Sequence, residues 1–339
     1  MSATARSGEP MRVLLTASRT APNWEPWGRE MLAELTRSHD VRLVDHDRPL
    51  ADQVADPGIQ VVVDASFLGT PEVLAAAAGH VRLWQLGSVG YDYLDMASFV
   101  RHGIPVANQP GFTSARSLAE HALMLAMLVQ RNYHGMVATV AGGTLGTPTG
   151  RQLAGRSLLI IGLGASGREL ARRAAAFEMR VHAVTRSGPH EAVRRRLGLA
   201  SLRGMDALDD ALTQADVVSL HVPLSAETRN ILDARRLRLI RPGGVIVNVS
   251  RGGLVDEAAL VEAVRDGHLY GAGLDVVDGE PAKPDNPLLG VPNIYVLSHV
   301  AGATDATAHR RARFAALNIS RLARGLEPLC RVDRLPPQG

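Results

Sequence analysis

The sequence predicts an α/β protein built from two parallel-sheet domains. Short β-rich runs alternate with helical stretches through nearly all of the 339 residues, which is the pattern of parallel sheets covered by helices. A long apolar helix and an irregular segment divide these runs into an earlier and a later series. A chain of this length is also long for a single core, so we expect two domains.

The earlier series predicts the sheet of a first domain. Its strands are expected at 13–16, 41–44, 60–63, 83–86 and 105–107. Amphipathic or alanine-rich helices lie between them, among them 27–36 and 71–78. A last helix, expected at about 304–323, follows the later series and completes the first domain. The first domain is therefore expected to be discontinuous.

The residues between the two series predict a buried helix. TSARSLAEHALMLAMLVQRN begins at Thr113, and Thr113 or Ser114 can cap a helix that ends near Arg131. Its apolar residues leave little polar face, and such a helix is buried between domains or between subunits. The segment AGGTLGTPTGRQLAG, at 141–155, then interrupts regular structure.

The later series predicts a doubly wound dinucleotide-binding domain, the Rossmann fold. Six strands are expected at 157–161, 180–184, 217–220, 245–249, 271–274 and 294–297. Helices are expected between them, including 166–177 and 256–265, and this alternation is typical of the fold. We place the Rossmann domain at 107–299 and the discontinuous first domain at 1–106 and 300–339.

Composition and charge exclude several function classes. The net charge is +3 and the charges are scattered, so nucleic-acid binding is not expected. No apolar run approaches the roughly 18 residues of a membrane span, and the first ten residues do not resemble a signal peptide. Cys330 is the only cysteine, so no internal disulfide forms and we expect a cytoplasmic protein. Lys283 is the only lysine, a P-loop is absent, and no metal site is expected.

The stretch LLIIGLGASGREL predicts a phosphate-binding turn. Gly162, Gly164 and Gly167 follow an apolar strand and open a helix. Glycines there allow a tight turn, close backbone approach to a diphosphate and close helix packing. Spacing alone is weak evidence, and a plain strand–helix turn is the alternative. The strand–turn–helix context favours a dinucleotide site, for which we name Gly162, Gly164, Ala165, Ser166 and Gly167.

The end of the second Rossmann strand predicts a preference for NADP(H). A site that prefers NAD usually has Asp or Glu here to bind the ribose hydroxyls, whereas this chain has Thr185, Arg186 and Ser187. No carboxylate in this run repels a 2′-phosphate, and Arg186 can bind one through two hydrogen bonds. The alternative is an exposed loop arginine in an arginine-rich protein. NAD remains a weaker possibility.

Three polar residues follow the last apolar strands of the later series. Arg251 lies in GVIVNVSRGG, Glu280 lies in GLDVVDGEP and His299 lies in IYVLSHVAG. Open α/β sheets bind ligands at the carboxyl ends of their strands. Taken singly, the arginine could be a surface group, the glutamate a loop acid and the histidine a packed residue. Together they form a set that suits the reduction of a 2-oxo acid.

Each member of this set suits one part of that reaction. Arg251 can hold the carboxylate and polarise the carbonyl with its planar array of donors. His299 can donate a proton near neutral pH, and Glu280 would tune it by favouring the protonated imidazole. The nicotinamide carries the hydride. We therefore predict that His299 protonates the carbonyl oxygen on reduction and removes the proton on oxidation.

Seven motifs resemble the D-isomer-specific 2-hydroxyacid dehydrogenase family, in the family's order. They are GSVGYDYLD, NQPGFTSARSLAEH, IIGLGASG, ADVVSLHVPLSAETRNIL, RPGGVIVNVSRGGLVDEAAL, GAGLDVVDGEP and LSHVAGAT. The resemblance implies a doubly wound, flavodoxin-like substrate domain around an inserted Rossmann domain, and a homodimer formed largely by the Rossmann domain. It also implies that Arg251, Glu280 and His299 are the catalytic set.

The resemblance assigns further roles by position. Val89 and Gly90 look like the loop whose N–H groups bind the substrate carboxylate, and Asp275 looks like the residue that holds the nicotinamide carboxamide. For His221, a packed residue at a strand end is an alternative of similar weight. The cofactor-binding positions implied by the motifs are Thr113, His221, Val222, Pro223, Val249, Ser250, Asp275, His299 and Gly302.

The motifs look most like those of glyoxylate and hydroxypyruvate reductases, because SVGYDYL and the Thr-Arg-Ser loop match that branch. The expected activity is the reduction of a small 2-oxo acid to the D-2-hydroxy acid. A non-catalytic, dinucleotide-sensing protein of the corepressor type remains the alternative. Trp24 and Trp27 either shape the substrate pocket or only pack. The segment 141–153 lacks a tryptophan that relatives often have in their dimer arm.

Overall fold

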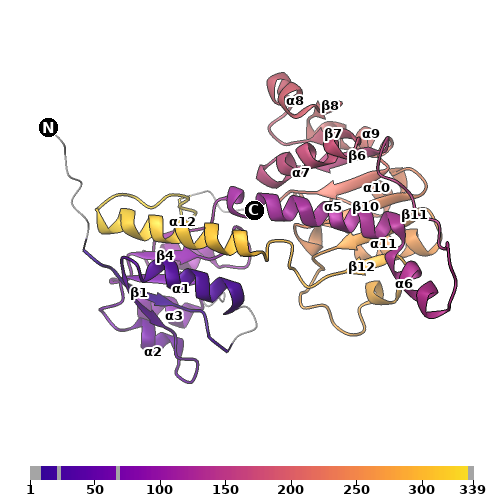
Figure 1. Cartoon of the computed structure of the whole chain (residues 1–339). Helices are drawn as coiled ribbons and strands as arrows, with labels where there is room; N and C mark the ends of the chain where they lie inside the picture. Colours follow the sequence, from indigo (N-terminus) through magenta and orange to yellow (C-terminus); the bar gives the residue numbers. More distant parts are fainter. Residues whose placement is uncertain (1–8, 21–23, 66–68, 335–339) are drawn as a thin grey trace. The chain divides into compact units, whose positions relative to one another are not determined.

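The computed structural model describes residues 9–20, 24–65 and 69–334. Its contacts divide the chain into two compact units, one formed by Met1–Thr113 with Ala303–Gly339 and the other by Ser114–Gly302 (Figure 1). Each unit contains one parallel sheet with helices on both faces. The predicted fold class is therefore confirmed, whereas the predicted limits at 106/107 and 299/300 remain predictions.

The first unit contains a five-stranded parallel sheet in the order β2-β1-β3-β4-β5. The chain winds from β1 to β2 in one direction and from β3 onward in the other, which is the flavodoxin-like arrangement. The strands are β1 Arg12–Leu15, β2 Asp40–Leu43, β3 Val61–Asp64, β4 Leu83–Leu86 and β5 Val106–Ala107. The helices are η1 Trp24–Gly28, α1 Arg29–Leu35, α2 Leu50–Val54, α3 Pro71–Ala77, α4 Met96–Arg101, η2 Gly111–Thr113 and α12 Asp305–Ala323.

Alternating side chains of β1 supply both faces of this sheet. Val13 and Leu15 pack against α1 and α12, whereas Leu14 packs on the opposite face with residues of α2, α3 and α4. Helix α12 comes from the C-terminal part of the chain and lies beside α1, as the yellow and indigo helices of Figure 1 show. The first unit is therefore built from both ends of the sequence.

The second unit contains a seven-stranded parallel sheet in the order β12-β11-β10-β9-β6-β7-β8. Its strands are β6 Ser157–Ile161, β7 Arg180–Val184, β8 Ser201–Arg203, β9 Val217–Leu220, β10 Gly244–Asn248, β11 Leu269–Leu274 and β12 Ile294–Val296. The winding direction changes between β6 and β9, as in the Rossmann fold. The prediction of six strands was wrong because β8 has only three residues, and its single buried side chain gives no apolar run.

The helices of the second unit cover both faces of its sheet. They are α5 Ala115–Arg131, α6 Tyr133–Ala141, α7 Ala165–Ala176, α8 Glu191–Leu197, η3 Met205–Ala207, α9 Leu208–Leu212, α10 Ala234–Leu239, η4 Gly252–Leu254, α11 Glu257–Arg265 and η5 Pro287–Gly290. Asp256 caps α11 by accepting a hydrogen bond from the N–H of Ala259. None of the described helices is long and apolar enough to cross a membrane.

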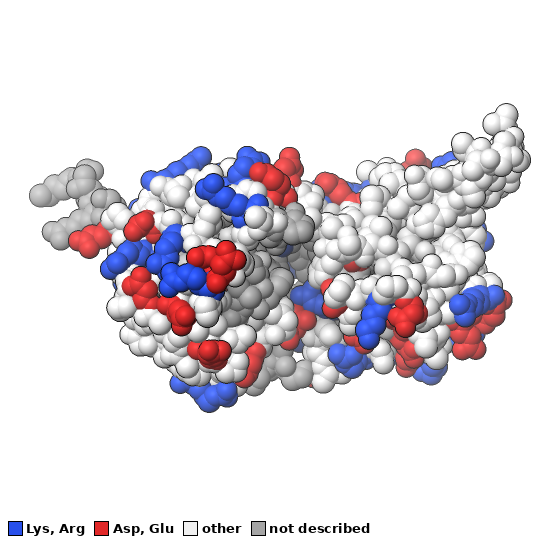
Figure 2. All heavy atoms as spheres, turned by 90° about the horizontal axis from the view of Figure 1, so that it is seen from below, with Lys and Arg blue, Asp and Glu red and all other residues white. Residues whose placement is uncertain are grey.

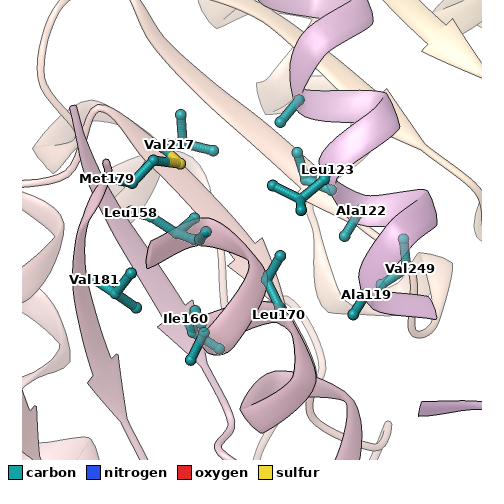
Figure 3. Packing of buried hydrophobic residues seen from close by; sticks show 14 of the residues in the cluster. Ala119, Ala122, Leu123, Leu158, Ile160, Leu170, Met179, Val181, Val217 and Val249 are labelled. Carbon is teal, nitrogen blue, oxygen red and sulfur yellow. The ribbon is translucent and has the colours of Figure 1, made fainter. Parts of the chain in front are cut away.

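Helix α5 packs inside the second unit. Side chains of α5 and α7 point toward β6 and its neighbours in Figure 3, where Ala122, Leu170 and Ile160 belong to one cluster. This contact explains why α5 is so apolar. Ser114 occupies the N-cap position of α5, one of the two predicted, but its side chain makes no capping hydrogen bond, and the Thr113 hydroxyl donates to the carbonyl of Pro110.

Candidate active site

Five neighbouring strands of the second unit end at one edge of its sheet. They are β12, β11, β10, β9 and β6, which are all parallel, so their carboxyl ends face the same way. This is the edge at which open α/β sheets bind ligands. Most sequence-predicted residues of this unit follow those strand ends, and Thr185, Arg186 and Ser187 follow β7.

The turn after β6 has the geometry of a diphosphate-binding turn. Gly162 has φ +98°, and a Cβ there would overlap the carbonyl of His221. A Cβ on Gly167 would overlap the carbonyl of Gly162, so this glycine allows the helix to approach closely. A Cβ on Gly164 would meet nothing within 4 Å, which leaves its side of the turn open. The open turn at the N-terminus of the 12-residue helix α7 fits the anionic part of a dinucleotide.

His221, at the end of β9, is a buried residue of this turn. One ring nitrogen lies 3.0 Å from the Ser166 hydroxyl and the other lies 3.0 Å from the Ser219 hydroxyl. Burial lowers the pKa of His221 to about 4, so the ring is neutral at physiological pH. The surroundings of His221 are therefore those of a packed residue at a strand end, which was the alternative interpretation. The ring connects β9 to the first turn of α7.

The turn after β10 is held by Asn248, which the sequence analysis did not single out. Asn248 accepts a hydrogen bond from the Ser250 N–H at 3.1 Å and donates one to the Arg251 carbonyl at 2.8 Å. The Ser250 hydroxyl donates to the carbonyl of Leu220 at 3.0 Å. Asn248 is the one polar residue in an otherwise apolar strand, and this was the signal from which its role could have been predicted. The two hydrogen bonds of Asn248 fix the backbone from which Arg251 projects.

Close packing of the backbone explains why Gly252 follows the arginine. A Cβ at this position would overlap the carbonyl of Val277 and the backbone nitrogen of Asp278. The turn after β10 therefore lies directly against the backbone of the loop after β11. Because that loop carries Glu280, Gly252 allows the arginine turn and the glutamate loop to be neighbours.

Glu280 and His299 form the hydrogen-bonded pair that the sequence predicted. His299 Nδ1 lies 2.7 Å from Glu280 Oε2, and the other carboxylate oxygen, Oε1, accepts a hydrogen bond from the Val277 N–H. The side chains are 49% and 35% exposed, so both groups can reach a ligand. His299 has φ +56°, a left-handed conformation, and its N–H donates to the carbonyl of Asp275. Among the described residues, no hydrogen bond is made by the second ring nitrogen of His299, Nε2.

Asp275, at the end of β11, holds the segment that carries His299. Its two carboxylate oxygens accept hydrogen bonds from the N–H groups of Val300 and Ala301 at 2.9 and 2.8 Å. His121 Nε2 lies 3.2 Å from Oδ1. Burial raises the pKa of Asp275, but His121 and the two N–H groups outweigh it, so the pKa lies below its usual value. His121, in the motif AEH, was quoted in the sequence analysis without a role.

The loop after β7 presents the predicted discriminating residues. The Thr185 and Ser187 hydroxyls lie 3.2 Å apart, and Arg186 is exposed. A hydrogen bond with Ser225 lowers the pKa of Glu227. The positive charge of Arg186 lowers it further. The loop is therefore polar and cationic, with one carboxylate nearby that the sequence analysis did not consider.

Three predicted residues lie in the first unit. The carbonyls of Val89 and Gly90 accept hydrogen bonds from the side chains of Asn108, at 2.6 Å, and Ser88, at 2.7 Å. Within the described ranges, no residue accepts a hydrogen bond from the N–H of Val89 or Gly90. These N–H groups are available for a carboxylate. Thr113 is buried, and its carbonyl accepts a hydrogen bond from Arg310.

The other predicted cofactor residues occupy the same edge of the second unit by chain position. Ala165 begins α7, Val249 follows β10, and Gly302 follows the segment that carries His299. Val222 and Pro223 come directly after His221. Over residues 9–20, 24–65 and 69–334, the structure brings together no group of three His, Cys, Asp or Glu side chains that could hold a metal ion.

Comparisons with known proteins identify the family. Residues 122–301 match the family model described as "D-isomer specific 2-hydroxyacid dehydrogenase, NAD binding domain". A glyoxylate reductase of Korarchaeum cryptofilum is 35% identical over 258 residues, which are 74% of this chain and 76% of that protein. A D-3-phosphoglycerate dehydrogenase of Mycobacterium tuberculosis (strain H37Rv) is 34% identical over 307 residues, or 88% of this chain. The match spans 54% of that longer enzyme.

A solved structure with the same fold is the NADPH-dependent glyoxylate/hydroxypyruvate reductase of Sinorhizobium meliloti, in complex with NADP and malonate. It is 27% identical with a TM-score of 0.78, and the match covers 96% of this chain and 97% of that chain. The family model, the sequence relatives and the fold all agree. The chain belongs to the D-isomer-specific 2-hydroxyacid dehydrogenase family and is an NAD(P)-dependent oxidoreductase.

Proposed function

We propose that the protein reduces a small 2-oxo acid of the glyoxylate or hydroxypyruvate type to the D-2-hydroxy acid. The observation that carries this proposal is the His299–Glu280 pair, with 2.7 Å between Nδ1 and Oε2, next to the turn that carries Arg251. The family supports 2-oxo acid reduction, and relatives named glyoxylate reductase favour this substrate type.

The proposed mechanism divides the work among few residues. Arg251 binds the substrate carboxylate, and its guanidinium also polarises the carbonyl. In the first unit, the N–H groups of Val89 and Gly90 are the proposed donors to a carboxylate. Glu280 holds Nδ1 of His299, so Nε2 delivers a proton to the carbonyl oxygen on reduction and removes it on oxidation. The nicotinamide cofactor supplies the hydride when it is bound. Asp275 keeps the His299 segment in place through two backbone N–H groups.

A substrate panel tests this function. The purified protein should oxidise NADPH in the presence of glyoxylate or hydroxypyruvate, and chiral analysis should identify the product of hydroxypyruvate as the D isomer. Turnover should fall sharply in His299→Ala and persist in His309→Ala, a control at an exposed histidine of the first unit. Binding of dinucleotide without turnover of any 2-oxo acid would instead support the sensor alternative.

The preference for NADP(H) is part of the proposal. Support comes from the exposed Arg186 between two hydroxyl residues and from the absence of Asp or Glu at 185–188. The Sinorhizobium relative is described with NADP. Loss of a bidentate phosphate contact costs about 1.5–3 kcal/mol, so Arg186→Ala should raise the KM for NADPH about 10–100-fold. The KM for NADH should change far less, and equal changes would contradict the preference.

We also propose a homodimer through the second unit. Segment 132–150 has no Lys, Arg, Asp or Glu, and Figure 2 shows a projection without these residues that carries α6 and the following loop. No side chain of α6 is buried, and Val137, Val140 and Leu145 are 51%, 79% and 95% exposed. His134 anchors α6, because its N–H donates to the Tyr295 hydroxyl. Such an apolar surface fits a second copy of the chain.

Light scattering on a sizing column tests the dimer. The wild type should elute with twice the mass of the 36.2 kDa chain. The double substitution Val137→Glu with Val140→Glu should give a folded monomer. A monomeric wild type at micromolar concentration would contradict this part of the proposal. The cytoplasmic location predicted from the sequence also remains a proposal, to be tested by cell fractionation.

A further inference from the structure

Arg311, on α12 of the first unit, is a half-buried cation that forms no ion pair with any residue in 9–20, 24–65 or 69–334. Its guanidinium carbon lies 4.7 Å from the centre of the Trp27 ring, which provides a cation–π contact. Its Nε is buried and has no hydrogen-bond partner. Burial lowers the pKa of Arg311 to about 10, so the group is still charged at neutral pH. A buried charge without a counter-ion is costly, and such groups are candidates for ligand binding.

Acids around α12 are used by other residues. Glu30, on the neighbouring helix α1, lies 3.6 Å from Arg29 and 3.5 Å from His309. No Asp or Glu among the described residues forms an ion pair with Arg311. The neighbouring Arg310 donates instead to the carbonyl of Thr113 at 2.7 Å. Within the part of the chain that the structure describes, Arg311 therefore has no anion that balances its charge.

Arg311 belongs to the carboxyl edge of the first unit's sheet. Trp27 follows β1, and Gln109 follows β5. Gln109 ties two segments together, because its N–H donates to the carbonyl of Ser88 and its side chain donates to the carbonyl of Arg311. Ser88 directly precedes the Val89–Gly90 loop, and its hydroxyl lies 2.9 Å from that of Tyr93.

We infer that Arg311 binds a second anionic group of the substrate, so the preferred 2-oxo acids carry a carboxylate or phosphate beyond the 2-oxo carboxylate. This inference rests on the proposed function and extends it to a substrate class. The Val89–Gly90 loop takes the carboxylate beside the carbonyl, and Arg311 takes the distal anion. Trp27 holds the guanidinium in position and gives the distal site one apolar wall.

Matched substrate pairs test the inference. 2-Oxoglutarate and 2-oxopentanoate have the same carbon chain and differ in the distal carboxylate, as do oxaloacetate and 2-oxobutanoate. The wild type should prefer the dianion of each pair by about tenfold or more in kcat/KM, which is the effect of one charged hydrogen bond. Arg311→Met should remove this preference and change kcat/KM for the monoanions by less than about threefold.

Arg313→Met is the matched control, because Arg313 lies on the same helix and is exposed. It should leave both members of each pair unchanged, and Arg311→Lys should retain part of the preference. Equal kcat/KM for dianion and monoanion in the wild type would overturn the inference. An equal loss on both substrates in Arg311→Met, with a lower Tm, would also overturn it and leave Arg311 a structural role.

Failure of the proposed function gives a different result. If no 2-oxo acid is reduced with either cofactor, the proposed function is wrong, and calorimetry with succinate and butyrate then tests the distal site directly. Tighter binding of succinate that is lost in Arg311→Met, but not in Arg313→Met, supports the anion site. Equal binding of the two acids overturns it.

Discussion

His221 and His299 both end strands of the same sheet, but their surroundings give them opposite chemistry. His221 is 8% exposed, its two ring nitrogens lie 3.0 Å from serine hydroxyls, and burial lowers its pKa to about 4. The side chain of His299 is 49% exposed and has a carboxylate 2.7 Å from Nδ1. The first ring stays neutral and holds a turn, whereas the second is the proposed proton carrier of the reaction.

The comparison teaches that neighbouring groups, rather than residue type or strand position, decide the role of a histidine. A hydroxyl can accept or donate without changing its charge, so Ser166 and Ser219 suit a fixed neutral ring. A carboxylate such as Glu280 suits a ring that becomes charged during the reaction. The predictions below test this difference, beginning with the largest expected effect.

Removing the exposed ring should cost the most. His299→Ala should lower kcat by about 10³-fold, because a positioned general acid typically contributes 10²–10⁴-fold. His221→Asn, measured at saturating cofactor, should leave kcat within a factor of about three. Steady-state rates with the best substrate give both values. Comparable losses in the two variants would contradict the distinction between the rings.

The partner of the exposed ring should matter next. Glu280→Gln keeps a side-chain oxygen that can accept a hydrogen bond but removes its charge. A charged hydrogen bond contributes about 1.5–3 kcal/mol, so kcat should fall about 10–100-fold while the KM for the cofactor stays nearly constant. Glu257→Gln, on α11, is the control. A fall of less than twofold in Glu280→Gln would show that the charge has little effect on the reaction.

The buried ring should reveal itself in stability rather than in rate. Its pKa is about 4 in the folded protein against 6.5 ordinarily, so the unfolded state binds more protons between these pH values. The free energy of unfolding is therefore fully retained above pH 6.5 and falls as the pH drops toward 4. Because of this residue, lowering the pH from 7 to 5 should reduce the free energy of unfolding by about 2 kcal/mol.

Urea unfolding at the two pH values measures this loss. His221→Asn removes the titrating ring, so its free energy of unfolding should fall by about 2 kcal/mol less than that of the wild type over the same interval. An identical pH dependence in both proteins would mean that the ring is solvated in the folded state, contrary to its surroundings in the structure.

The smallest effect should come from the hydroxyl that joins the buried ring to the glycine turn. Ser166→Ala removes the 3.0 Å contact with His221. One neutral hydrogen bond contributes about 1 kcal/mol, so the KM for the cofactor should rise about fivefold with little change in kcat. Ser187→Ala, in the loop after β7, is the comparison variant, because it removes an exposed hydroxyl. A large fall in kcat in Ser166→Ala would contradict a purely supporting role.

Much of the fold followed from hydrophobic patterning. Strands such as β6 and β10 are buried along their whole length and consist mainly of apolar residues, so the sequence marks them clearly. The three-residue strand β8 and the exposed helix α6 do not, because their positions depend on contacts with distant parts of the chain. The missing capping bond from the Ser114 side chain at the start of α5 was not predictable for the same reason.

The site was predictable where backbone geometry demands a particular residue. Gly162 and Gly167 are required by close contacts, and the Glu280–His299 pair followed from strand ends and the family's motifs. Asn248 was missed because its role is to bond backbone groups of its own turn, and sequence patterns carry little information on such contacts. Arg311 was missed because a buried arginine resembles a surface arginine until its neighbours are known.

The glycine at 252 limits how the site can change. Because its α-carbon lies against the peptide between Val277 and Asp278, any side chain there would force the arginine turn and the glutamate loop apart. The positions of Arg251 and Glu280 are therefore coupled through this contact, and a single substitution at Gly252 would change both. Efforts to redesign substrate choice should leave this junction intact and vary positions on the first unit instead.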